Sequence, residues 1–172
     1  MRQNAIYYLL MFLLYLGAQV FLFNNMVLFG TAFCFIYIAF ILFLPFNVNP
    51  MIVIVFGFFG GLITDLFYNS MGINAAATVL IAFIRRPWIS LITPPGGYEE
   101  ITTPTAGALG LSWFIYYLFP LTLIHHLVLF QVEAGQLFIS WLIFKKVIAS
   151  AMFTTFVLIL IKYLFYRKLR TV

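Results

Sequence analysis

Residues 51–69 of the chain read MIVIVFGFFGGLITDLFYN, with Asp65 as the only charged side chain. A helix of about 20 apolar residues crosses the ~30 Å hydrocarbon core of a bilayer. Similar runs recur along all 172 residues, of which 65% are hydrophobic and only 8% are charged. A soluble domain normally carries about a quarter charged residues. The sequence therefore predicts an all-α integral membrane protein.

Polar residues, proline and glycine interrupt the apolar runs and divide the chain into six predicted transmembrane helices. The longest interruption is the polar segment 93–110. The predicted helices cover residues 5–23, 27–44, 51–69, 72–92, 111–132 and 145–166. They form one transmembrane domain over residues 1–172, and we interpret the first run as an uncleaved helix because it lacks a signal-peptide cleavage site.

The distribution of lysine and arginine predicts that both termini are cytoplasmic. Basic residues are retained on the cytoplasmic side of a membrane more readily than they are translocated. In this orientation only Lys145 and Lys146 lie outside, whereas seven basic residues lie inside: Arg2, Arg85, Arg86, Lys162, Arg167, Lys168 and Arg170. An even number of helices agrees with this arrangement.

Two segments do not fit the simple six-helix scheme. The helix from Gly72 reaches Arg85 after only ~20 Å, so either the third and fourth helices lie below the outer surface, or the arginines snorkel and the helix continues past Pro87 to Ile92. Residues 136–144 are predicted to lie along the outer interface. A last helix that began there would place two lysines deep in lipid, at a high energetic cost.

Several functional classes have no support in the residue pattern. The net charge of +5 is spread over helix ends and forms no basic patch with exposed aromatics, so nucleic acid is not an expected partner. Cys34 is the only cysteine, which excludes an internal disulfide and a cysteine zinc site. No nucleophile–base pair or metal triad lies on one predicted helix face. We therefore expect no enzyme activity, no cofactor and no metal.

Asp65 is the one acidic residue well inside a predicted helix, so it needs a partner in the protein or water. A rise of ~1.5 Å per residue places Asp65 and His125 at about the same depth in their helices. This predicts an outer-leaflet polar cluster of Asp65, either His125 or His126, and Asn69 or Lys145. A hydrogen-bonded clamp between helices is the favoured interpretation, while a partner contact, proton transfer and ligand binding stay open.

Small residues on the third and fourth predicted helices form two surfaces that allow close helix approach. The first contains Gly57, Gly60, Gly61 and Thr64, and the second contains Gly72, Ala75, Ala76, Ala77 and Thr78. We expect the two surfaces to pack on each other, with docking of a separate partner helix as the alternative.

The cytoplasmic segment 93–104 contains Tyr98, Glu99 and Glu100 among turn-forming residues. It is either a solvated connector or a docking loop for a cytoplasmic partner. The basic residues from Lys162 to Arg170 are expected to hold the last helix against anionic lipid headgroups.

The pattern Gly61-Leu62-x-x-Asp65, followed by Gly72-x-x-Ala75 in the next helix, resembles the signature of the MreD family of bacterial rod shape-determining membrane proteins. The length, the number of predicted helices and their orientation are similar over nearly the whole chain. Further features resemble one branch of the family: Arg86-Pro87, the segment from Pro95 to Glu100, and His125-His126.

The resemblance implies a non-enzymatic scaffold in the bacterial inner membrane that takes part in cell elongation. It would bind MreC and connect cytoplasmic MreB filaments with the peptidoglycan polymerase RodA and its class B penicillin-binding protein. The family fold is similar to that of the substrate-binding subunits of energy-coupling-factor vitamin transporters. A vitamin-binding subunit of that kind is the alternative function, although the first helix lacks their Ala-x-x-x-Ala pattern.

Overall fold

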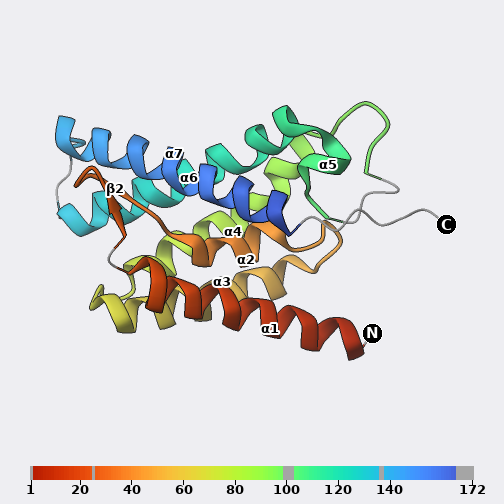
Figure 1. The fold of residues 1–172 in the computed structure, drawn as a ribbon, viewed down its shortest axis with the longest axis horizontal. Helices are drawn as coiled ribbons and strands as arrows, with labels where there is room; N and C mark the ends of the chain where they lie inside the picture. The colour runs from red at the N-terminus through yellow and green to blue at the C-terminus, as the bar shows by residue number, and fades with distance from the viewer. Residues whose placement is uncertain (1, 25, 99–102, 136–137, 166–172) are drawn as a thin grey trace.

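The computed structural model describes residues 2–24, 26–98, 103–135 and 138–165, with side chains from residue 6 onward. Five long helices run along its longest axis (Figure 1): α1 (Arg2–Ala18), α3 (Pro50–Tyr68), α4 (Ile73–Leu91), α6 (Leu111–Ala134) and α7 (Trp141–Leu164). A π-helical turn, η1 (Gln19–Phe23), extends α1, and the short α5 (Ala106–Leu109) precedes α6. This confirms the predicted all-α class.

Four of these helices are long and apolar enough to cross a membrane: Ile6–Phe23, Pro50–Tyr68, Leu111–Ala134 and Trp141–Leu164. The chain is therefore a multi-pass helical membrane protein. Helix α4 is as long as α3 but contains Arg85 and Arg86, which lower its mean hydropathy. The helices predicted at 5–23, 51–69, 72–92 and 111–132 all form, with ends that differ by a few residues.

The prediction of one helix over 27–44 is wrong. This segment forms a small hairpin of β1 (Val27–Leu28) and β2 (Ala32–Phe33), then extended residues, a 3-10 turn η2 (Ile36–Ile38) and the short helix α2 (Ala39–Phe43). Residues 34–44 are all buried. An apolar run fits a protein interior as well as lipid, and its aromatic and β-branched residues are only moderate helix formers. We call residues 31–45 the irregular segment.

The predicted start of the last helix at residue 145 is also wrong, because residues 141–144 of the stretch predicted at 136–144 are helical. Helix α7 already begins at Trp141, and the Ser140 side chain caps it by accepting a hydrogen bond from the amide of Ile143. Lys145 and Lys146 therefore lie in the first two turns of α7. Residues 136 and 137 lie outside the described parts of the chain.

The core forms where α3 packs on α4, α4 on α6 and α6 on α7, with the irregular segment between these helices and α1. Phe114, Tyr117 and Leu121 of α6 are fully buried. The bundle has two ends (Figure 1). The hairpin end contains β1, β2, the turn between α3 and α4, and the connection from α6 to α7; the terminal end contains α5, the start of α1 and the end of α7.

Candidate functional site

The carboxylate of Asp65 joins α3 to the beginning of α4. Its Oδ1 accepts hydrogen bonds from the hydroxyl of Ser70 (2.6 Å) and the backbone amide of Asn74 (2.9 Å), and its Oδ2 accepts one from the amide of Ala75 (2.9 Å). The first amides of a helix have no partner within the helix and carry the positive end of its dipole. Asp65, only 4% exposed, thus caps the beginning of α4 from within the protein.

The turn between the two helices depends on backbone conformations that few residues adopt. Helix α3 ends where Asn69 takes a left-handed conformation (φ 54°), and α4 begins after Gly72, with a φ of 91°. Asparagine and glycine tolerate positive φ better than other residues do. Asn69 therefore shapes the turn and makes no hydrogen bond to the carboxylate of Asp65.

Gly61 lies directly against the backbone of α4. A Cβ atom at this position would stand 2.4 Å from the Cα and 2.6 Å from the N of Ala75. Gly57 faces Ala82 and Ile41, while Gly60 faces the ring of Phe12 in α1. The expected packing of α3 on α4 is therefore confirmed at Gly57 and Gly61, whereas Gly60 packs on α1 and Ala76 of the second surface is exposed.

A chain of hydrogen bonds extends from Asp65 to His125. The side-chain amide of Asn74 donates to Oδ1 of Asp65 (3.1 Å), and its Oδ1 accepts from the hydroxyl of Tyr37 (3.2 Å). The same hydroxyl lies 2.8 Å from Nε2 of His125 and 2.8 Å from the hydroxyl of Thr78. The predicted pair of Asp65 and His125 is therefore part of one network, but Asn74 and Tyr37 stand between them.

This network ends at His125. Its Nδ1 atom is buried and has no hydrogen-bond partner among the described residues. The described contacts of this network join α3, α4, α6 and the irregular segment through Asp65, Asn74, His125 and Tyr37.

His126 belongs to a second network that holds the irregular segment. Its Nδ1 lies 2.6 Å from the carbonyl of Thr122 and its Nε2 lies 3.1 Å from the hydroxyl of Thr154. Because a carbonyl only accepts, Nδ1 carries the proton and Nε2 can accept from Thr154. The Thr154 oxygen in turn accepts from the backbone amide of Phe35 (3.2 Å).

Other polar side chains serve the backbone of the same segment. Gln19 donates to the carbonyl of Cys34 (3.2 Å) and accepts from the amide of Tyr37 (3.3 Å), and Ser150 accepts from the amide of Phe33 (2.9 Å). Non-helical backbone at membrane depth is tolerated only when its polar groups are satisfied by protein or water. These side chains provide hydrogen-bond partners for the backbone of the irregular segment. The only sequence feature that could have indicated this is Gln19, an isolated amide in an apolar run.

Arg85 performs the same task at the end of α2. Arg85 is 2% exposed, and its guanidinium donates to the carbonyl of Leu44 and, from Nε, to the hydroxyl of Tyr117 (2.8 Å). The Tyr117 hydroxyl donates to the carbonyl of Leu42 (2.7 Å). The alternative in which both arginines snorkel is therefore wrong for Arg85, because carbonyls at the end of α2 accept its hydrogen bonds inside the protein.

Arg86, in contrast, is exposed. Helix α4 continues past Pro87 to Leu91, which agrees with the predicted continuation of this helix toward Ile92.

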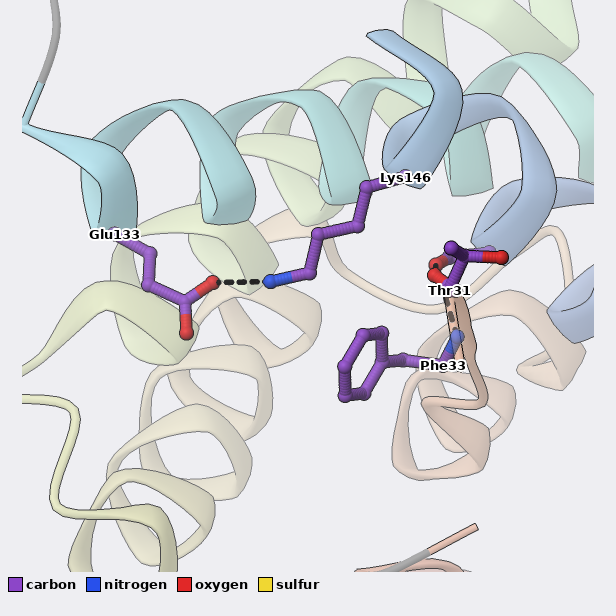
Figure 2. A network of polar contacts seen from close by, with 5 residues as sticks. Thr31, Phe33, Glu133 and Lys146 are labelled. Atoms are coloured by element: carbon purple, nitrogen blue, oxygen red, sulfur yellow. Dashed lines mark hydrogen bonds and ion pairs between the residues drawn. The ribbon is translucent and has the colours of Figure 1, made fainter. Parts of the chain in front are cut away.

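Lys146 closes one side of a cavity at the hairpin end. Figure 2 shows its side chain reaching from α7 toward Glu133 of α6, with the ring of Phe33 nearby. The ammonium lies 2.9 Å from Glu133 Oε2 and 4.1 Å from the ring centroid of Phe130. The cavity measures about 290 Å³ and combines aromatic walls with polar groups, including Phe33, Phe35, Phe67, Tyr68, Phe130, Asn24, Ser70, Asn74, Glu133 and Lys146.

The remaining predicted site residues lie apart from Asp65. Lys145 is exposed on α7, with its ammonium 5.0 Å from the ring centroid of Trp141. Tyr98 is bound to the bundle, since its hydroxyl donates to the carbonyl of Ile89 (3.0 Å) and its ring stacks on Phe46. Partial burial raises the pKa of the Tyr98 phenol above its ordinary value. Glu99 and Glu100 lie outside the described residues.

Among the described residues, no group of three or more histidine, cysteine, aspartate or glutamate side chains is placed to hold a metal ion. Comparison of the chain with family models, curated proteins and solved structures gave no match. The fold and the site together define a multi-pass helical membrane protein in which buried polar side chains hold one irregular segment and one tight helical hairpin.

Proposed function

We propose that this protein is a non-enzymatic scaffold subunit of the bacterial cell-elongation complex, as its resemblance to the MreD family implies. It would bind MreC and thereby couple cytoplasmic MreB filaments to peptidoglycan synthesis by RodA and a class B penicillin-binding protein. The observation that carries the proposal is the joint role of the motif residues. Gly61, Asp65, Gly72 and Ala75, which bear the resemblance, meet at one junction between α3 and α4.

A junction of this kind suits a scaffold. The two helices are held by close backbone contact and by a buried carboxylate, so the outer surface of the hairpin keeps a fixed shape. A fixed surface lowers the entropic cost of binding a partner helix. The motif would then act on partners through the shape of the hairpin, since its own residues face inward.

The proposal includes six membrane crossings with both termini in the cytoplasm of the bacterial inner membrane. The irregular segment would provide the second crossing and α4 the fourth. Support comes from the basic residues at the terminal end, namely exposed Arg86 and half-buried Lys162, against Lys145 and Lys146 at the hairpin end. A reporter fused after Val172 should be accessible only from the cytoplasm. Access only from outside would overturn this orientation.

The partner surface can be mapped by cysteine cross-linking to the transmembrane helix of MreC. Single cysteines would replace exposed residues on separate faces: Leu10 on α1, Phe59 on α3 and Phe156 on α7. In membranes we expect one face to cross-link and the others to remain unmodified, and MreC to co-purify with the unaltered protein. If no face cross-links and MreC does not co-purify, the scaffold proposal is wrong.

The cavity at the hairpin end favours a second candidate, a small-molecule-binding subunit of a vitamin transporter. Aromatic walls with a few convergent polar groups are typical of ligand sites, and this cavity has both. Denaturation of the purified protein would release a retained vitamin, which mass spectrometry would identify. A vitamin found with the wild type but not with Phe35→Ala or Asn74→Ala would favour the transporter over the scaffold.

A further inference from the structure

Lys162 occupies an unusual position at the terminal end of the bundle. It lies in the last turn of α7 and is half-buried, with its ammonium 4.8 Å from the ring centroid of Phe43 in α2. Among the described residues no carboxylate lies within ion-pair distance of it. A buried or half-buried ammonium normally has hydrogen-bond acceptors. Lys162 therefore has donors that this part of the chain does not satisfy.

The side chain of Lys162 borders two cavities. The larger, about 330 Å³, lies between α5, α6 and α7 and is lined almost entirely by carbon, from Ala106, Gly107, Leu111, Phe114, Ile159 and Tyr163. The smaller, about 60 Å³, lies against α1 and α2. There, the hydroxyls of Tyr8 and Tyr15 form no hydrogen bonds with other described residues.

We propose that this position binds an anionic phospholipid. Its phosphate would lie at Lys162 with the tyrosine hydroxyls as further donors, and one acyl chain would fill the apolar cavity beside Ile159. The argument is one of complementarity: a cation without an anionic partner among the described residues adjoins an apolar cavity, and an amphipathic anion satisfies both at once. The site goes beyond the proposed scaffold function and does not depend on it.

The position of Lys162 also distinguishes a specific lipid-binding site from the general attraction of anionic lipids to basic residues. A lysine at a helix end usually extends its ammonium into the headgroup layer. Lys162 instead directs its ammonium over an aromatic ring within the bundle, next to a cavity. Removal of this one charge should therefore affect lipid selectivity more than removal of another lysine of the same helix.

Native mass spectrometry of the full chain would test this, after reconstitution in phosphatidylcholine with a minority of phosphatidylglycerol. We expect wild type to retain phosphatidylglycerol selectively and Lys162→Met to lose about fivefold of that selectivity. Lys162→Arg should restore most of it, and Lys145→Met, at the other end of α7, should resemble wild type. Equal selectivity in Lys162→Met and wild type would overturn the proposal.

The acyl chain is tested separately by filling the cavity without changing the charge. Ile159→Trp should release the bound phosphatidylglycerol, whereas Phe156→Trp, on the exposed side of α7, should not. A phosphatidylglycerol with a photoreactive acyl chain should cross-link near Leu111. Retention by Ile159→Trp, or equal competition by soluble glycerol phosphate, would show that the cavity holds no chain and would refute the site.

Discussion

Replacement of Gly61 by alanine should destabilise the protein severely, because the new methyl group would meet backbone atoms. The added Cβ would lie 2.4 Å from the Cα of Ala75 and 2.7 Å from the carbonyl oxygen of Asn74, where ordinary contacts begin at 3.4 Å. Helices α3 and α4 would have to separate by about 1 Å. A flexible side chain could turn away from such a contact, but helix backbone cannot.

The cost has two parts. Overfilling a close-packed interface costs about 1–3 kcal/mol. A separation of this size would also stretch the two 2.9 Å hydrogen bonds from the amides of Asn74 and Ala75 to Asp65. A hydrogen bond to a charged group contributes about 1.5–3 kcal/mol. We therefore expect a loss of roughly 3–6 kcal/mol, a large fraction of the ~5–15 kcal/mol that stabilises a typical folded protein.

Unfolding of the purified protein in mild detergent, followed by circular dichroism as a denaturing detergent is added, would measure this loss. Gly17→Ala is the matched control, since nothing lies within 4 Å of a Cβ at Gly17 in α1. The control should be neutral or more stable by about 0.5–1 kcal/mol, because alanine favours helix. Gly61→Ala within about 1 kcal/mol of wild type would refute the close-contact argument.

Three further substitutions test the buried polar groups by the same unfolding measurement. Asp65→Asn should cost about 2–3 kcal/mol, because a neutral amide with one acceptor replaces a carboxylate that caps α4; an unchanged midpoint would contradict the capping role. Thr154→Val keeps the side-chain shape but leaves a buried amide of the irregular segment without an acceptor, so we expect a loss of about 1–3 kcal/mol, and a neutral result would mean that this amide has another partner. Arg85→Met should cost about 3–5 kcal/mol, since the carbonyls at the end of α2 lose their donor, whereas the exposed Arg86→Met should stay within about 0.5 kcal/mol of wild type. Equal effects of the two arginine substitutions would show that Arg85 is not the buried anchor.

The interior polar groups of this protein have a shared physical task. In water a loop can exchange its backbone hydrogen bonds with solvent, but in lipid each unpaired amide or carbonyl is costly. Side chains from η1, α4, α6 and α7 provide partners along the irregular segment. Their removal should therefore loosen the segment as a whole, which gives these residues a structural role.

The sequence by itself determined the class of protein and most of its long helices. So many hydrophobic runs of membrane-spanning length with so few charges indicate a membrane protein. Punctuation by proline, glycine and asparagine located the ends of α1, α3, α4 and α6 to within a few residues. The packing of Gly57 and Gly61 on the small residues of α4 also followed from spacing alone. Periodicity and composition report these features because each depends on residues close together in the chain.

Only the tertiary structure decided how the second apolar run folds and where the buried charges go. Residues 27–44 are as apolar as a membrane helix, but Gln19, Ser150, Thr154 and Arg85 supply hydrogen bonds that let this run leave the helical conformation. These partners are more than a dozen residues away in sequence. Likewise, spacing placed Asp65 and His125 at one depth, but Tyr37 and Asn74 connect them. Hydrophobicity specifies burial, whereas the partner of each buried polar group depends on which helices lie side by side.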